Sequence, residues 1–183
     1  PDVDGKAVGG WGYVQLGEKH EDHQATMGII VHELGHDLGL PDLYDYSDTG
    51  EGLGNWSLMA AGEWGQAAGD AHLGQTPTLM DAWSRATLGW LTPQRVTGTQ
   101  ALSLPAATAA TDDGLVVQLG ENPGGADWDW YDPSEGEYFL IENRQRTPGT
   151  YDASLPGDGL LILHVDENQR DNADPERPLV DVE

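Results

Sequence analysis

The clearest hydrophobic pattern in the chain lies between about residues 24 and 38, where apolar positions recur with the spacing of one helix face. Four of them fall between about 160° and 260° on a helical wheel that starts at His32, and these are Ile30, Val31, Leu34 and Leu38. Gly39 and Pro41 follow, a pair typical of the end of a helix. The pattern predicts a helix whose apolar stripe packs in the core. Gly28 and Gly35 share another side of this helix, which predicts that a second segment approaches the backbone there.

A second helical pattern begins at Thr76 and Pro77, a capping residue followed by proline at the first helical position. Apolar residues then recur at helical spacing, namely Leu79, Trp83, Ala86 and Trp90. Gly89 marks the end of the pattern. We expect a packing helix here.

Beyond the second helix the period of the pattern shortens to that of strands. Apolar runs bounded by glycine, proline and acidic residues predict strands at 115–119, 138–142 and 160–165, and a weaker patch at 11–16 predicts an edge strand. The segment 122–137 reads as a long loop, either the rim of a substrate cleft or plain surface. The tail from residue 166 to 183 is acidic and irregular. Helices and strands in separate stretches predict an α+β fold.

The composition of the chain excludes several kinds of chemistry and disfavours several classes of partner. A chain of 183 residues with 38% hydrophobic residues suits one domain, and it has no apolar run long enough to span a membrane. Cysteine is absent, so no disulfide or thiol chemistry is available. The 32 acidic residues against 8 basic ones give a formal charge of -24, which disfavours nucleic acids and anionic membranes as partners.

The candidate chemistry lies on the first helix, in the sequence His32-Glu33-Leu34-Gly35-His36. The two histidines are four residues apart, so they lie one turn apart and about 40° around the helix, opposite the apolar stripe. Two imidazoles in this arrangement can bind one metal ion. Glu33 lies about 60° from His36, close enough to act on a metal-bound water and too far round to compete easily as a ligand.

Zinc needs a third protein ligand and an open position for water. Asp42 lies ten residues after His32, which gives the metzincin spacing H-E-x-x-H-x-x-G-x-x-D with aspartate in the third ligand position. Alternatively, Asp42 is only a turn residue, and Glu51 or Glu63 is the third ligand.

Other polar residues have competing interpretations. His20 and His23 precede the helix and could contact the metal, but we expect them to be solvated. His164 lies in a predicted strand and is expected to be a hydrogen-bonded structural residue rather than a ligand. Two sets of oxygen donors could bind Ca²⁺, although solvated acidic loops are the favoured explanation. The first set is Asp45, Asp48 and Glu51, and the second is Asp166, Asn168, Asp171 and Asp174.

Several segments in one order together resemble the immune inhibitor A type of secreted bacterial metalloproteases, a metzincin-related family. The matching segments are residues 32–36 with 40–45, 54–60, 88–91, 138–145 and 155–166. The second of them, Gly-Asn-Trp-Ser-Leu-Met-Ala, places Met59 in a turn of small residues suited to the Met-turn of metzincins.

The resemblance implies a secreted, extracellular zinc endopeptidase that acts on proteins or peptides and is made as a longer precursor. His32, His36 and Asp42 would bind Zn²⁺, Glu33 would be the catalytic base and Met59 the Met-turn residue. Residues 1–44 would supply the end of an upper lobe and the active-site helix, and residues 45–183 the lower lobe, within a single catalytic-domain segment whose upper-lobe sheet is incomplete. The alternative is a non-catalytic, metal-stabilised acidic module for binding or adhesion, which predicts metal-dependent stability without hydrolysis.

Overall fold

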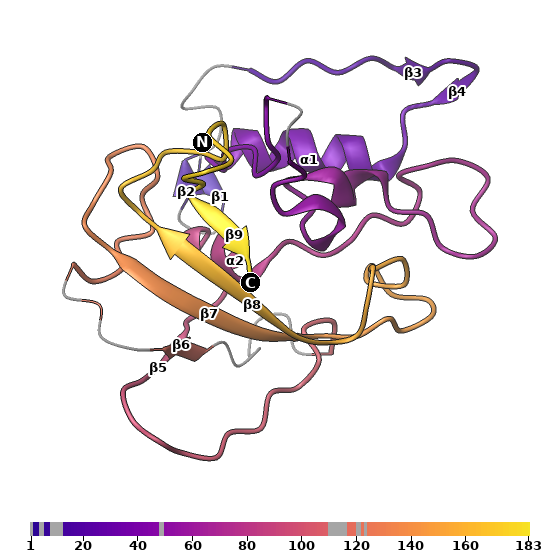
Figure 1. The fold of residues 1–183 in the computed structure, drawn as a ribbon. Helices are drawn as coiled ribbons and strands as arrows, with labels where there is room; N and C mark the ends of the chain where they lie inside the picture. Colours follow the sequence, from indigo (N-terminus) through magenta and orange to yellow (C-terminus); the bar gives the residue numbers. More distant parts are fainter. Residues whose placement is uncertain are drawn as a thin grey trace.

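The computed structural model describes residues 2–3, 6–7, 13–47, 50–109, 117–119, 122 and 124–183 (Figure 1). Within these ranges the chain is a mixed α/β protein, in agreement with the α+β prediction. Its helices are α1 (Met27–Asp37) and α2 (Ala82–Thr87), with two 3-10 turns, η1 (Gly54–Trp56) and η2 (Ala61–Trp64). Its strands are β1 (Asp2–Val3), β2 (Lys6–Ala7), β3 (Lys19–His20), β4 (His23–Gln24), β5 (Gln94–Val96), β6 (Val117–Leu119), β7 (Glu137–Arg144), β8 (Gly159–Asp166) and β9 (Val180–Val182).

The main sheet has five strands in the order β5-β6-β7-β8-β9, and it is antiparallel except where β5 pairs with β6. The strands predicted at 138–142 and 160–165 are confirmed and are longer than predicted. Of the strand predicted at 115–119, residues 117–119 form β6, and the other two lie outside the described residues. The pattern missed β5 and β9, which are only three residues each.

The core lies between one face of this sheet and the helical part of the chain. Along β7 the buried positions alternate, and the inward face carries Tyr138, Leu140, Glu142 and Arg144. Helix α2 contacts β7. The largest fully buried apolar side chains around them are Leu40, Leu43, Leu53, Met59, Trp83, Leu163 and Leu179. The fold therefore packs the segment after α1 directly against the sheet.

The orientation of α1 differs from the prediction. Ile30 and Leu34, the centre of the predicted core stripe, are 39% and 50% exposed, whereas His32 is only 4% exposed. The buried side of the helix is the side with Gly28, His32 and Gly35. The glycines let neighbouring segments approach this side closely, so it packs inward despite being the less apolar one.

The start of α2 also differs from the prediction. The helix begins after Asp81, whose carboxylate accepts a hydrogen bond from the Ser84 amide at 2.9 Å. Residues 76–81 are not helical because their backbone bonds elsewhere: the Thr78 amide donates to the Gly62 carbonyl and the Leu79 amide to the Asp152 carboxylate. A threonine and a proline that suit a helix start therefore belong to an irregular buried segment.

A buried ionic network joins this segment to the sheet. Arg144 is fully buried and donates to both carboxylate oxygens of Asp152, at 2.6 and 2.8 Å, and to Glu142 at 3.2 Å. It also donates to the backbone carbonyls of Trp56 and Leu79. Burial lowers the pKa of Arg144, but the two carboxylates outweigh it and raise the pKa, so the side chain stays charged.

The segment before α1 forms a small hairpin in place of the predicted edge strand. Residues 13–17 form no strand, residues 11 and 12 lie outside the described residues, and β3 pairs with β4 instead. His20 and His23 on this hairpin are half-buried, so their rings are only partly solvated, and the ring of His23 stacks on His72. His164 is a hydrogen-bonded residue of a strand, as predicted, because its Nε2 lies 3.1 Å from a Glu137 carboxylate oxygen. Among the described helices, none is long and apolar enough to cross a membrane.

Candidate metal centre

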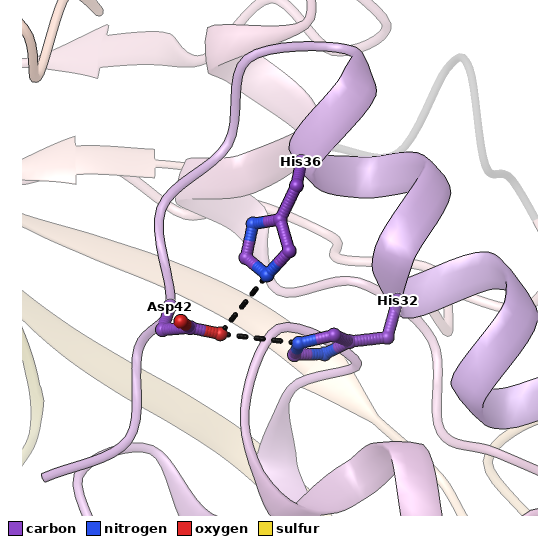
Figure 2. A group of neighbouring side chains, drawn as sticks. All are labelled: His32, His36 and Asp42. Carbon is purple, nitrogen blue, oxygen red and sulfur yellow. Dashed lines mark ion pairs between the residues drawn. The ribbon is translucent and has the colours of Figure 1, made fainter. Parts of the chain in front are cut away.

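Successive turns of α1 bring His32 and His36 onto one face, and the chain then turns back beneath them. Gly39 has φ of 95°, a left-handed conformation that glycine adopts without strain, and Asp42 follows three residues later. Figure 2 shows both rings pointing toward Asp42. The Nε2 atoms of His32 and His36 each lie 3.1 Å from the same carboxylate oxygen, Oδ1 of Asp42. The structure therefore brings together all three residues predicted to bind the metal.

The other nitrogen of each ring is held by the backbone. Nδ1 of His32 lies 2.8 Å from the Leu58 carbonyl oxygen, and Nδ1 of His36 lies 2.8 Å from the Leu40 carbonyl oxygen. A carbonyl oxygen only accepts hydrogen bonds, so both Nδ1 atoms must donate. In a neutral imidazole this leaves the Nε2 lone pair directed at Asp42. Backbone carbonyls commonly orient metal-binding histidines in this way.

The donor set fits a divalent cation. Oδ1 of Asp42 is buried and accepts no aligned hydrogen bond, although two ring nitrogens surround it. One ligand atom from each of the three residues lies within 4.8 Å of the others. Ligand atoms of a tetrahedral zinc site are about 3.3 Å apart for bonds of about 2.0 Å. Two imidazoles and a carboxylate are a typical catalytic zinc set, so the residues present fit zinc.

The electrostatics of the site reflect the shared carboxylate. Burial lowers the pKa of His36, but contact with Asp42 and the Leu40 carbonyl outweighs it and raises the pKa to about 9. Burial raises the pKa of Asp42, yet the two histidines and Tyr46 hold it well below its ordinary value. Asp42 is therefore ionised at neutral pH and favours positive charge at the Nε2 atoms.

Three carboxylates predicted for the site differ in position. Glu33 is half-buried, and its charge contributes to raising the pKa of His36. Glu63 has an oxygen 3.7 Å from Nδ1 of His32, the ring nitrogen directed away from Asp42. Its pKa is raised, first by burial and then by Asp42 and Glu33. Glu51 is exposed, and among the described residues neither Glu51 nor Glu63 joins the converging group. This arrangement favours Asp42 as the third ligand.

The glycine side of α1 packs tightly against the segments beneath it. A Cβ atom added at Gly35 would overlap the sulfur of Met59, which is fully buried. A Cβ atom added at Gly28 would overlap the backbone carbonyl of Glu63. The close approach predicted for these glycines is confirmed. It brings this side of α1, which includes His32, into the buried interior.

A cavity of about 310 Å³ opens beside His36 and Asp42, the two half-buried members of the group. It is lined by His36, Gly39, Leu40, Pro41, Asp42, Tyr46, Trp130 and Asp171. Trp130 comes from the segment 122–137, so this loop contributes to the rim of the site, one of the two roles open to it from the sequence. Sequence reasoning missed Trp130 and Tyr46 as site residues. Tyr46 lies four residues after Asp42, whereas nothing local in the sequence connects Trp130 with the helix.

The calcium predictions find no support. Both carboxylate oxygens of Asp45 accept hydrogen bonds from its own loop, from Ser47 and Gly50, and Asp48 lies outside the described residues. In the tail, the carboxylates of Asp166, Asp171 and Asp174 accept bonds from residues two positions later. Within the described ranges, the only group of ligands that converges is the one on α1 and Asp42.

Comparison with known proteins agrees with this site. Residues 17–91 match the family model described as the immune inhibitor A peptidase M6 catalytic domain. A segment of 66 residues, 35% of the chain, is 44% identical to the pre-pro-metalloprotease PrtV of Vibrio cholerae serotype O1. A segment of 60 residues, 31% of the chain, is 43% identical to Immune inhibitor A of Bacillus thuringiensis subsp. alesti. No solved structure matches the chain.

The site and the matched segment resemble those of a metallopeptidase. Within that class, residues 17–91 match the immune inhibitor A family model, and this match supports the resemblance found in the sequence. The motifs beyond residue 91 lie outside the matched segment. The matches cover only 7% of PrtV and 9% of Immune inhibitor A, so this chain corresponds to a small part of those relatives.

Proposed function

We propose that this chain carries the active site of a secreted, zinc-dependent endopeptidase of the metzincin type, with His32, His36 and Asp42 as the zinc ligands. The observation that carries the proposal is the convergence of two Nε2 atoms on one buried carboxylate oxygen, each at 3.1 Å. The match of residues 17–91 to a peptidase catalytic domain and the names of two relatives support it. Its substrates are proteins and peptides.

The residues divide the work of peptide hydrolysis. When bound, zinc supplies Lewis-acid chemistry, acidifying water and polarising the substrate carbonyl. Glu33 accepts the proton of the attacking water as general base and then donates it to the leaving amine. Glu33 suits this role because its charge acts on His36, Tyr44 and Glu63, all around the site. Among the described residues, no ion pair holds Glu33 away from the site.

Met59 is the Met-turn residue in this proposal. Its side chain is fully buried, and its sulfur faces Gly35, the residue before His36. The Met59 carbonyl accepts a 2.7 Å hydrogen bond from the Leu43 amide, next to Asp42. One turn thus supports both the helix that carries the histidines and the segment that carries the aspartate.

Cleavage of an unfolded protein tests the proposal. The zinc-loaded chain is expected to produce internal fragments, and Glu33→Gln at equal zinc content is expected to lower kcat/KM by about 10²- to 10⁴-fold. Glu176→Gln, which neutralises an exposed carboxylate in the tail, serves as the matched control and should leave the rate unchanged.

Two results would overturn the proposal in different ways. Equal rates for wild type and Glu33→Gln would remove Glu33 from the mechanism. Tight zinc binding by the wild type without any cleavage would favour the non-catalytic, metal-stabilised module instead.

A further inference from the structure

The carboxylate of Asp42 uses its two oxygens differently. Oδ1 faces the Nε2 atoms of His32 and His36, at 3.1 Å from each. Oδ2 accepts a 2.7 Å hydrogen bond from the hydroxyl of Tyr46. The side chain of Asp42 is 15% exposed, so few water molecules compete for either oxygen. The hydroxyl therefore fixes which oxygen is available to a cation.

The position of Tyr46 is itself set by its neighbours. Its ring packs edge-on against Tyr44, with centroids 5.0 Å apart and an interplanar angle of 61°. The ring of Tyr44 in turn lies parallel to that of His32, at 6.4 Å and 16°. The rings of Tyr44 and Tyr46 and the Tyr46 hydrogen bond thus form a continuous path from His32 to Asp42. The arrangement holds Tyr46 beside the carboxylate although the side chain is 52% exposed.

We propose that Tyr46 is a positioning residue for the zinc site: its hydroxyl holds Oδ2 of Asp42, so that Asp42 binds the cation through Oδ1 alone. This inference rests on the proposed function and adds a residue outside the H-E-x-x-H-x-x-G-x-x-D pattern. A carboxylate held to one oxygen keeps the coordination number low and leaves a position open for water. Partners of metal ligands typically contribute about 10- to 100-fold to metal affinity.

The hydroxyl is a reliable donor in this environment. Burial and the neighbouring Asp42 raise the pKa of Tyr46 above its ordinary value, so the hydroxyl carries its proton at neutral pH. Tyr46 also lines the cavity that contains His36 and Asp42. It therefore acts at the edge of the reaction site without contacting the reacting atoms.

Zinc affinity and the spectrum of bound cobalt test the inference. Tyr46→Phe keeps the ring and removes only the hydroxyl. We expect it to weaken zinc binding, measured by competition with a chelating dye, by about 10-fold or more. In the Co²⁺ form, a freed Oδ2 can coordinate as well, so we expect weaker visible absorption, as for a higher coordination number. Tyr151→Phe, at a 52% exposed tyrosine outside the site, is the matched control.

Two further measurements separate this inference from its alternatives. Thermal unfolding in chelator should be the same for Tyr46→Phe and wild type, which distinguishes positioning from a general loss of stability. On an Asp42→Ala background, Tyr46→Phe should have no further effect on zinc affinity, because its partner is gone. Zinc affinity and cobalt spectrum equal to wild type in Tyr46→Phe would overturn the inference. A wild type that binds no zinc would instead overturn the proposed function.

Discussion

At the scale of single residues, Asp152 shows how much one buried carboxylate does. It receives two hydrogen bonds from the fully buried guanidinium of Arg144 and one from the Leu79 amide. Asp152→Ala would leave the buried guanidinium of Arg144 paired with only one carboxylate, that of Glu142. We expect a loss of about 3 to 5 kcal/mol in the free energy of unfolding, measured with urea.

The chain offers a matched control for that experiment. Asp158 forms an ion pair with Arg146 at 3.0 Å, but both side chains are more than 40% exposed. Asp158→Ala should therefore leave the free energy of unfolding close to that of the wild type. Similar losses for the two variants would contradict the role given to the buried network.

Gly28 carries a second prediction at this scale. A Cβ atom there would overlap the Glu63 backbone carbonyl, which cannot move as a side chain can. Gly28→Ala should destabilise the chain by about 1 to 3 kcal/mol through overpacking. Gly98→Ala is the control, since nothing lies within 4 Å of a Cβ atom at that exposed glycine. Thermal and urea unfolding of the pair provide the measurement, and equal stability would contradict the close packing of α1.

The site itself was predictable where its residues are close in sequence. His32, His36 and Asp42 lie within eleven positions, and helical geometry with one turn suffices to bring them together. Trp130 reaches the same cavity from a loop about ninety residues away, and only the tertiary fold creates that contact. Tyr46 is close in sequence, but its hydrogen bond depends on the irregular turn after Pro41.

At the scale of elements, the side of α1 that packs could not be read from its periodicity. The pattern indicates which residues share a face, and it assigns the more apolar face to the core by default. Here the face with the smaller side chains, at Gly28 and Gly35, is buried because it admits the Glu63 backbone carbonyl and the Met59 side chain at close range. The long strands β7 and β8 were predicted well because each is a short apolar run bounded by glycine, proline or acidic residues.

Helix α2 carries the prediction at this scale. Asp81 caps the helix through the Ser84 amide and also accepts hydrogen bonds from the hydroxyls of Ser57 and Ser84. Asp81→Ala should therefore cost about 2 kcal/mol of stability, more than an isolated cap. Thr76→Ala, at the predicted but incorrect start, should cost about 0.5 kcal/mol or less. The reverse order in urea unfolding would reassign the start of the helix.

At the scale of the whole molecule, the proposed metal site links parts of the chain that are far apart. Its histidines are hydrogen-bonded through Nδ1 to the backbone carbonyls of Leu58 and Leu40. Both leucines belong to the main hydrophobic core. A ligand that binds only the folded chain stabilises it, by about 2.7 kcal/mol at a free concentration of 100 times Kd. We expect zinc to raise Tm in calorimetry and a chelator to reverse the change. His36→Ala should lose most of this response, and an equal rise in that variant would exclude binding at this site.

The segment 76–81 has a consequence for the motions of the protein. It has no regular secondary structure, yet its Thr78 and Leu79 amides are bonded to Gly62 and Asp152, and its Leu79 carbonyl is bonded to Arg144. These amides should therefore exchange with deuterium only when the sheet unfolds, as slowly as the amides of β7 and β8. The exposed stretch 97–103, equally irregular, should exchange within seconds, so the slowest-exchanging part of this protein extends beyond its helices and strands.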